Sequence, residues 1–162
     1  MENSNILLKI NGVDGSSTLS KFEKQIECDS WSFGVTQPTS GSRSGSERNA
    51  ANPIFSDITL TKEADISSTA LFRLCATADE IDKVELTILR KADAENKPLV
   101  VIQLEKVIFS NYMVSSSGIS RPVETISLNF VKVKMVYHHQ DNDGKVTGST
   151  YFAYDLALNT KA

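Results

Sequence analysis

The sequence has 162 residues, the length of one domain rather than two, so we expect a single domain over residues 1–162. Hydrophobic residues make up 40% of the chain and charged residues 23%, a composition that excludes disordered and collagen-like chains. The net charge is −3 and no run of four basic residues occurs, which argues against binding to nucleic acid. No apolar segment approaches the roughly 20 residues of a membrane-spanning helix, so we expect no membrane insertion.

The N-terminal segment predicts a strand without an export signal. Apolar residues recur at every second position, at Ile6, Leu8 and Ile10, and this period of two is typical of a half-buried strand. Glu2 stands where a secretory signal is basic, and the apolar run stops at Lys9. We therefore expect no signal peptide, and folding in the cytoplasm.

Two long apolar runs change phase in the middle. The first passes from Cys28 to Trp31, with the change near Asp29-Ser30, and the second changes near Phe130-Val131. A slip of one residue exchanges the buried and exposed faces of a strand, so each run needs a bulge or a bend. Long bent strands allow two sheets to share strands and curl into a barrel.

Thr36 to Pro53 is a long polar loop in the prediction. Ten of its eighteen residues are Ser, Thr, Gly or Asn, and compact domains rarely hold loops longer than about 12 to 15 residues without a function or disorder. The composition leaves a binding arm and a flexible loop equally open.

One segment, at about residues 67–78, has the period of a helix. Leu71, Leu74, Cys75 and Ala78 follow one another at the spacing of a single helical face, after Ser and Thr residues that can cap the first turn. Alternating runs elsewhere predict strands: Ile54–Leu60, Val84–Ile88, Val100–Phe109, Ile126–Phe130 and Tyr151–Leu158. The predicted fold is mainly β, a two-sheet β-barrel or sandwich with one short flanking α-helix.

No group of residues predicts catalysis, a cofactor or a metal site. His138 and His139 are adjacent in a strand and so point to opposite faces, and Asp141-Asn142-Asp143-Gly144 is typical of a turn. We interpret Cys28 and Cys75, which are far apart and have no nearby His, as reduced core residues. We expect that the protein is not an enzyme.

Several segments, taken in their order, are similar to the haemolysin-coregulated protein (Hcp) family, whose members form the tube of bacterial type VI secretion systems. The resemblance covers nearly the whole length. The segments that carry it are Ile6–Ile10, Gly12–Gly15, Trp31–Gln37, Ile58–Lys62 with Asp65 and Ser67-Ser68, Leu86–Ile88 with Arg90–Ala92, and Glu124–Phe130.

The resemblance implies a β-barrel subunit that assembles as a hexameric ring. Rings of the family stack into a hollow tube, which a contractile sheath propels out of the cell with a spike protein at its tip and effector proteins in its lumen. The protein would therefore be assembled in the bacterial cytoplasm and then secreted without a signal peptide, into the extracellular space or a target cell.

The resemblance also implies roles for particular residues. Ser32 corresponds to a lumen-facing position, and Gly34 shares its strand face, although exposure on an outer face would explain Ser32 as well. The polar loop resembles the element that reaches a neighbouring ring or subunit; its candidate contact residues are Gln37, Ser42, Arg43, Ser44, Glu47 and Arg48. The alternative function is a monomeric β-sandwich that binds a ligand through residues 36–53.

Overall fold

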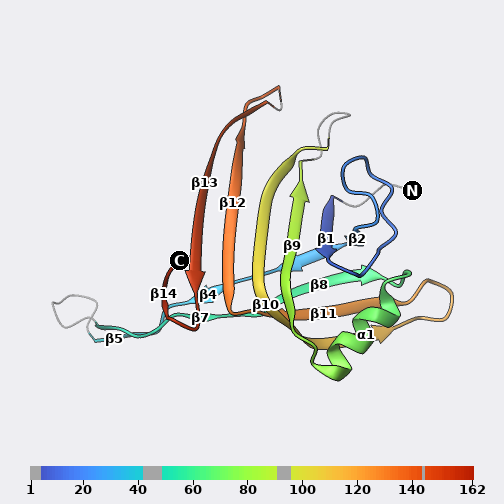
Figure 1. Cartoon of the computed structure of the whole chain (residues 1–162), viewed down its shortest axis with the longest axis horizontal. Helices are drawn as coiled ribbons and strands as arrows, with labels where there is room; N and C mark the ends of the chain where they lie inside the picture. The colour runs from blue at the N-terminus through green and yellow to red at the C-terminus, as the bar shows by residue number, and fades with distance from the viewer. Residues whose placement is uncertain (1–4, 42–48, 91–95, 144) are drawn as a thin grey trace.

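The computed structural model describes residues 5–41, 49–90, 96–143 and 145–162 (Figure 1). These residues form one helix, α1 (Ser68–Thr77), and a series of β-strands. The strands are β1 (Ile6–Ile10), β2 (Ile26–Cys28), β3 (Ser30–Ser32), β4 (Val35–Thr36), β5 (Thr39–Ser40), β6 (Asn49–Ala50), β7 (Ile54–Phe55), β8 (Ile58–Glu63), β9 (Ile81–Leu89), β10 (Pro98–Ser115), β11 (Val123–Asn129), β12 (Lys132–Gln140), β13 (Val146–Asp155) and β14 (Thr160–Lys161).

Two sheets make up the body of the protein and share the long strand β10. One sheet has seven strands in the order β2-β1-β9-β10-β12-β13-β14, and the other has four in the order β10-β11-β8-β3. In Figure 1 the seven-stranded sheet stands upright and the four-stranded sheet lies across its foot, with α1 beside it. All pairings are antiparallel, as expected when strands are joined by short turns.

Both expected bends occur where the two sheets meet. Asp29 separates β2 from β3, and its N–H donates to the carbonyl of Thr61 at 2.7 Å. The second bend lies between β11 and β12, opposite Lys106 of β10, whose φ of 55° is in the left-handed region. Among the described strands the two sheets do not close into a complete barrel, because β2 and β8 share no strand pairing. The sandwich form of the predicted fold therefore describes the molecule better than the barrel.

The core fills the space between the sheets. Alternate residues of β1, β8, β9, β10 and β11 point into it, as the period of two predicts. The predicted strands therefore supply most of the core, including Leu8, Leu60, Leu86, Leu104 and Leu128, each fully buried. Burial of this kind is the main force that holds the two sheets together.

Helix α1 matches the predicted helix, and Asp65 organises its start. The carboxylate of Asp65 accepts the N–H of Ser67 at 2.8 Å, and the N–H of Asp65 donates to the hydroxyl of Ser68 at 2.9 Å. The helix ends because Ala78 takes the left-handed conformation (φ 53°). Leu71 and Leu74 are buried against the sheets, whereas Ala78 is exposed.

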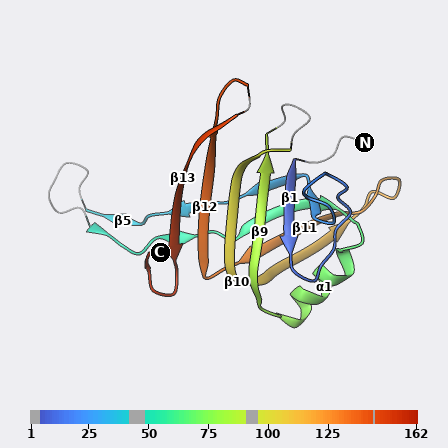
Figure 2. The same ribbon diagram turned by 45° about the horizontal axis from the view of Figure 1, so that its top comes forward.

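Three sequence expectations need correction. The predicted strand from Ile54 to Leu60 is interrupted, with β7 ending at Phe55 and β8 beginning at Ile58, and Ile54 is exposed. The predicted C-terminal strand continues to Leu158, but β13 ends at Asp155, whose carboxylate accepts the N–H groups of Ala157 and Leu158 at 3.0 and 3.1 Å and so forms a turn. The polar loop is not irregular at its base: β4 pairs with β7 and β5 with β6, which makes a two-stranded arm that projects from the body (Figures 1 and 2).

Candidate functional site

The outer side of the four-stranded sheet is lined by small polar side chains. Strand pairing aligns Ser32, Thr59, Ser127 and Asn111 in one row, and Ser30, Thr61, Thr125 and Met113 in the next. We call the polar members of these rows the hydroxyl face: Ser30, Ser32, Thr59, Thr61, Asn111, Thr125 and Ser127. None of them carries a charge.

Neighbouring side chains of the hydroxyl face bond to one another. The hydroxyls of Ser30 and Thr61 lie 2.5 Å apart, and those of Thr59 and Ser127 lie 3.2 Å apart. Pairs of this kind across strands stabilise a sheet and satisfy part of its hydrogen-bonding capacity. The seven side chains of the hydroxyl face therefore bind water and carry no fixed charge, and the one large apolar group in these two rows is Met113, which is 64% exposed.

The two residues predicted to face a lumen lie on or next to this surface. Ser32 is exposed on the hydroxyl face at the end of β3. Gly34 follows it, is exposed, and donates its N–H to the hydroxyl of Ser56 at 2.9 Å. A methyl group at Gly34 would lie 3.8 Å from that hydroxyl, which is ordinary contact.

The opposite side of the same strand segment is only partly buried. Trp31 and Phe33 pack against the core, but Val35 is 55% exposed. The alternation fails there because β3 ends at Ser32 and β4 pairs with β7 at the base of the arm.

The inner side of the four-stranded sheet holds a buried ionic network. Lys62 is fully buried, and its ammonium lies 2.6 Å from the carboxylate of Glu124 and 3.0 Å from that of Asp65. It also donates to the backbone carbonyl of Glu63 at 2.8 Å, and the hydroxyl of Tyr112 donates to Glu124 at 2.5 Å. The network joins β8, β10 and β11 to the start of α1.

Sequence reasoning missed this network although a signal was present. Lys62 is in phase with the inward residues Ile58 and Leu60, and Glu124 is in phase with Ile126 and Leu128. Charged residues at inward positions are rare unless they are paired. Two inward residues of opposite charge on neighbouring strands therefore predict an ion pair between them.

Burial shifts the pKa values of two groups in this part of the core. It raises the pKa of the Cys28 thiol to about 12, so the group stays protonated and unreactive at neutral pH. Burial together with the hydrogen bond to Glu124 raises the pKa of Tyr112 to about 12. Both shifts indicate a structural environment rather than a reactive one.

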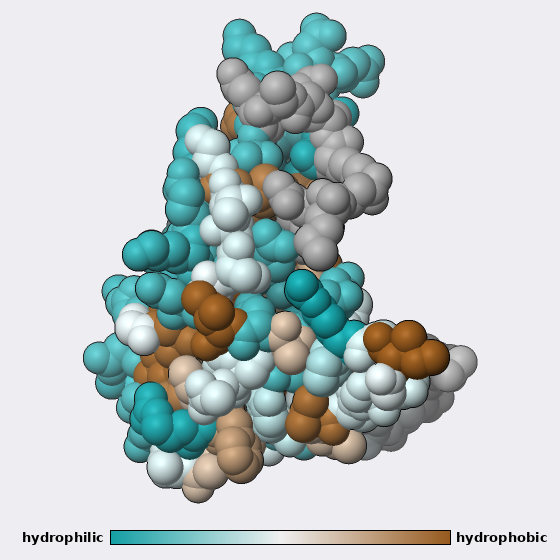
Figure 3. Space-filling model, turned by 90° about the vertical axis from the view of Figure 1, so that its right-hand side faces the viewer, coloured by the Kyte–Doolittle hydropathy of each residue, from teal (hydrophilic) through white to brown (hydrophobic). Residues whose placement is uncertain are grey.

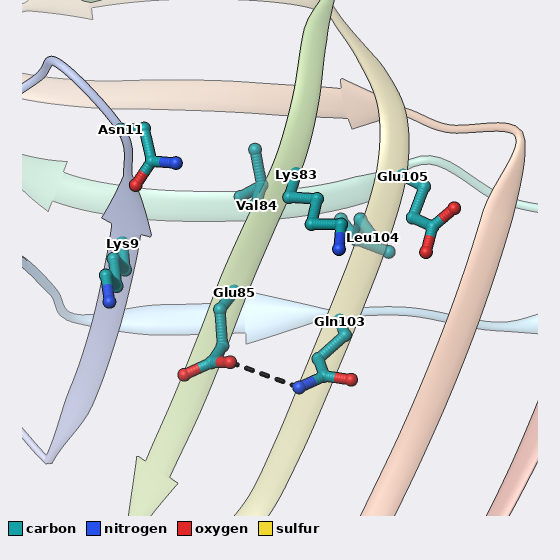
Figure 4. Close-up of a pocket in the computed structure, with 8 residues that line it drawn as sticks. All are labelled: Lys9, Asn11, Lys83, Val84, Glu85, Gln103, Leu104 and Glu105. Carbon is teal, nitrogen blue, oxygen red and sulfur yellow. Dashed lines mark hydrogen bonds between the residues drawn. The ribbon is translucent and has the colours of Figure 1, made fainter.

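The outer side of the seven-stranded sheet carries charges of alternating sign. One row contains Lys9, Glu85, Gln103 and Lys134, and the next contains Lys83, Glu105, Lys132 and Asp155. Five of these side chains and three neighbours line a shallow depression of about 240 Å³, in which the amide of Gln103 donates to Glu85 at 3.2 Å (Figure 4). The lining residues are Lys9, Asn11, Lys83, Val84, Glu85, Gln103, Leu104 and Glu105.

One carboxylate of this charged face has a shifted pKa. The N–H of Leu158 donates to the carboxylate of Asp155, and Lys132 lies 3.5 Å away. Together these contacts hold the pKa of Asp155 below its usual range.

The predicted contact residues of the arm lie mostly outside the described residues. This is true of Ser42, Arg43, Ser44, Glu47 and Arg48. Gln37 is described and exposed, and its amide donates across the arm to the carbonyl of Ala51. That bond helps to hold the two strands of the arm together.

The described residues contain no group of three or more His, Cys, Asp or Glu side chains that could hold a metal ion. Within the same ranges no helix is long and apolar enough to cross a membrane.

The structure places the adjacent histidines and the predicted turn on β12 and just after it. His138 and His139 pair with Ser149 and Gly148 of β13. Asp141 begins the predicted turn by accepting the N–H groups of Asp143 and Lys145.

Comparison with known proteins gives consistent matches. Residues 7–137 match the family model described as "Type VI secretion system effector, Hcp". The curated protein hcp1 of Pseudomonas aeruginosa is 32% identical over 109 residues, which cover 65% of this chain and 67% of that protein. A solved type six secretion system protein aligns with a TM-score of 0.90 at 26% identity, over 97% of this chain and 98% of its own. Hcp1 from Salmonella typhimurium aligns with a TM-score of 0.77 at 25% identity, over 99% of both chains.

Proposed function

Since this chain belongs to the Hcp family of type VI secretion system proteins, we propose that it is a tube subunit whose six copies form a ring. Rings would stack into a tube that leaves the bacterial cell. The family is one of structural, secreted proteins, and we propose no catalytic role. We propose further that residues 1–162 fold as one domain, since β10 belongs to both sheets.

The hydroxyl face is the observation that carries the proposal. A channel that passes unrelated effector proteins needs a wall without fixed charges or large apolar groups, because either would bind cargo too tightly to release it. The seven side chains of the hydroxyl face meet this need, whereas the outer side of the other sheet, with its alternating charges, does not. We therefore assign Ser32 and Gly34 to the lumen of the ring.

The charged outer side of the seven-stranded sheet would then face away from the lumen. Alternating lysine and glutamate side chains suit a partner with a matching charge pattern, and the contractile sheath that surrounds such a tube is the partner we propose. The spike protein would bind at the end of the tube.

The arm is the proposed contact between rings. It projects beyond the body along the direction of the strands of the four-stranded sheet (Figure 2). We expect that deletion of Gly41–Asn49 leaves the fold and the ring intact, because the core residues of the described chain are all retained, but weakens stacking. Negative-stain imaging of rings and tubes measures this, and a variant that forms tubes as readily as the parent would contradict the role of the arm.

The assembly itself is tested on the purified full chain. Size-exclusion chromatography with light scattering should give the mass of six chains, and negative-stain images should show closed rings with a central hole. A chain that stays monomeric at every concentration would overturn the proposal in favour of a monomeric ligand-binding sandwich. A closed ring needs a heterologous interface, in which two different patches of the subunit meet.

A further inference from the structure

The sequence contains a single Asn-Gly pair, Asn11-Gly12, which forms the turn that follows β1. Asparagine is one of the thermally labile residues of proteins, and it is most labile before glycine, because glycine has no side chain to hinder its own nitrogen. The N–H of Val13 donates to the carbonyl of Ile10 at 3.2 Å and closes the turn around the pair. Both residues of the pair are exposed, so water reaches them.

The backbone nitrogen of Gly12 is held by little else. Among the residues that the structure describes, its N–H donates no hydrogen bond, and a side chain at Gly12 would meet no atom within 4 Å. β1 and the loop after it lie on the side of the molecule that Figure 3 views, where hydrophilic side chains are exposed at every height. The nitrogen can therefore approach the Asn11 side chain without breaking a hydrogen bond or displacing a packed neighbour.

A similar pair three residues later, Asp14-Gly15, lies in the opposite environment. Gly15 is buried, and its N–H donates to the carbonyl of Lys24 at 2.7 Å. A side chain at Gly15 would collide with the backbone of Gln25 and Ile26. The nitrogen of Gly15 cannot approach the Asp14 carboxyl unless this hydrogen bond and this packing are lost. The fold therefore protects one pair and leaves the other open.

We infer that Asn11 is a site of spontaneous deamidation in the folded protein, and that the acid it yields pairs with Lys83 on the outer side of the seven-stranded sheet. The inference does not rest on the proposed function, because it concerns one turn and one strand pair within a single chain.

The reaction needs only water. The nitrogen of Gly12 attacks Cγ of Asn11 and loses its proton; the bond from Cγ to the side-chain nitrogen breaks, and that nitrogen leaves as ammonia. The cyclic imide that results is opened by water at either carbonyl carbon. Cleavage at Cγ gives aspartate, and cleavage at the main-chain carbonyl of residue 11 gives isoaspartate. Each route replaces a neutral amide with a carboxylate and so adds one negative charge to the net charge of −3.

The new carboxylate would lie across from a lysine. β1 and β9 pair as far as Ile10 and Val84, so the register continued by one step sets Asn11 opposite Lys83. Figure 4 shows Asn11 at the end of β1, across from Val84 and Lys83 of β9. Opposite charges on adjacent strands stabilise a sheet. A carboxylate at position 11 would also give alternating charge to the whole row, which continues from Lys83 with Glu105, Lys132 and Asp155.

Peptide mapping by mass spectrometry tests the site on the purified full chain at mildly alkaline pH. Asn11 should convert to aspartate and isoaspartate roughly tenfold faster than Asn142, an exposed turn residue that precedes Asp143. Asn11→Gln should abolish the main acidic species in native electrophoresis, and Asn142→Gln, the matched control, should leave it. Equal conversion of the two asparagines, or an acidic species that persists in Asn11→Gln, would overturn the inference.

The same mapping in urea shows whether the fold leaves the turn open. In the folded chain Asp14 should yield no isoaspartate, and in the unfolded chain it should. Asn11 should convert at a similar rate in both states. Conversion of Asn11 that requires urea would show that the folded turn prevents the reaction, and would overturn the inference without affecting the ring proposal.

Labelling of lysines tests the contact with Lys83. A carboxylate at position 11 should hold the ammonium of Lys83, so an amine-reactive ester should label it roughly twofold more slowly in Asn11→Asp than in Asn11→Gln. Lys145 is exposed beside the β12–β13 turn and is the reference that should label equally in both variants. A Lys83 that labels equally in the two variants would contradict the pairing.

Discussion

The two sides of the four-stranded sheet use polar residues in opposite ways. On the inner side, Lys62, Glu124, Asp65 and Tyr112 form a buried network in which every charge has a partner within 3.0 Å. On the outer side, Ser and Thr hydroxyls lie in water and bond only in pairs such as Thr59 with Ser127. The inner side therefore fixes the position of the sheet and α1, and the outer side is open to contact with other molecules.

The largest effect is expected from breaking the inner network. Lys62→Met leaves the buried carboxylate of Glu124 and the partly buried one of Asp65 without their cation, and should lower the free energy of unfolding by about 3–5 kcal/mol in urea unfolding monitored by circular dichroism. Lys106→Met is a matched control, because Lys106 also pairs with two carboxylates, of Asp82 and Glu80, but on the surface. Its unfolding midpoint should hardly move. Similar losses in the two variants would show that burial of the network does not matter.

A smaller effect is expected from Tyr112→Phe, which removes the hydrogen bond to Glu124. The loss at neutral pH should be roughly 1–3 kcal/mol, the usual cost of a hydrogen bond to a buried charged group.

The pKa shift of Tyr112 gives this variant a second readout. Because the pKa of Tyr112 rises from about 10 to about 12 on folding, its contribution is complete below pH 10 and disappears as the pH rises toward 12. The parent and Tyr112→Phe should therefore approach each other in stability over that range. Cys28, whose pKa is also about 12, is present in both proteins and cancels in the comparison. A stability difference that stays constant up to pH 12 would contradict the assignment.

The sequence predicted the strands of this sheet better than the ionic contacts on its inner side. Alternation located β8 and β11 and the bends near Asp29 and Phe130, because burial of one face imposes a period of two on the residues. The network was missed because a lysine or glutamate at an inward position has no meaning until its partner strand is known. Glu124 is 62 positions from Lys62, and only the register of β8 with β11 brings them together.

Pairing that depends on another segment also explains the errors at the arm and at the end of β13. The polar composition of residues 36–53 gives no sign that β4 would pair with β7, and the apolar run after Asp155 continues although the chain turns there. In both places the backbone hydrogen bonds decide the structure, and the side chains do not reveal them. The assignment of Ser32 and Gly34 to a lumen stays a prediction.

The smallest effect on stability, and the most specific one on function, is expected at Ser32. Ser32→Gln enlarges an exposed side chain, so the free energy of unfolding should change by less than about 0.5 kcal/mol and rings should form as before. In the lumen the longer side chain would project from six positions around the hole and should reduce the amount of effector protein that co-purifies with the rings. Ser149→Gln makes the same change on an exposed strand residue of the other sheet and should leave co-purification unchanged. If Ser32→Gln rings retain cargo as the parent does, the hydroxyl face does not line the lumen, and the difference between the two sides of the sheet would then concern stability alone.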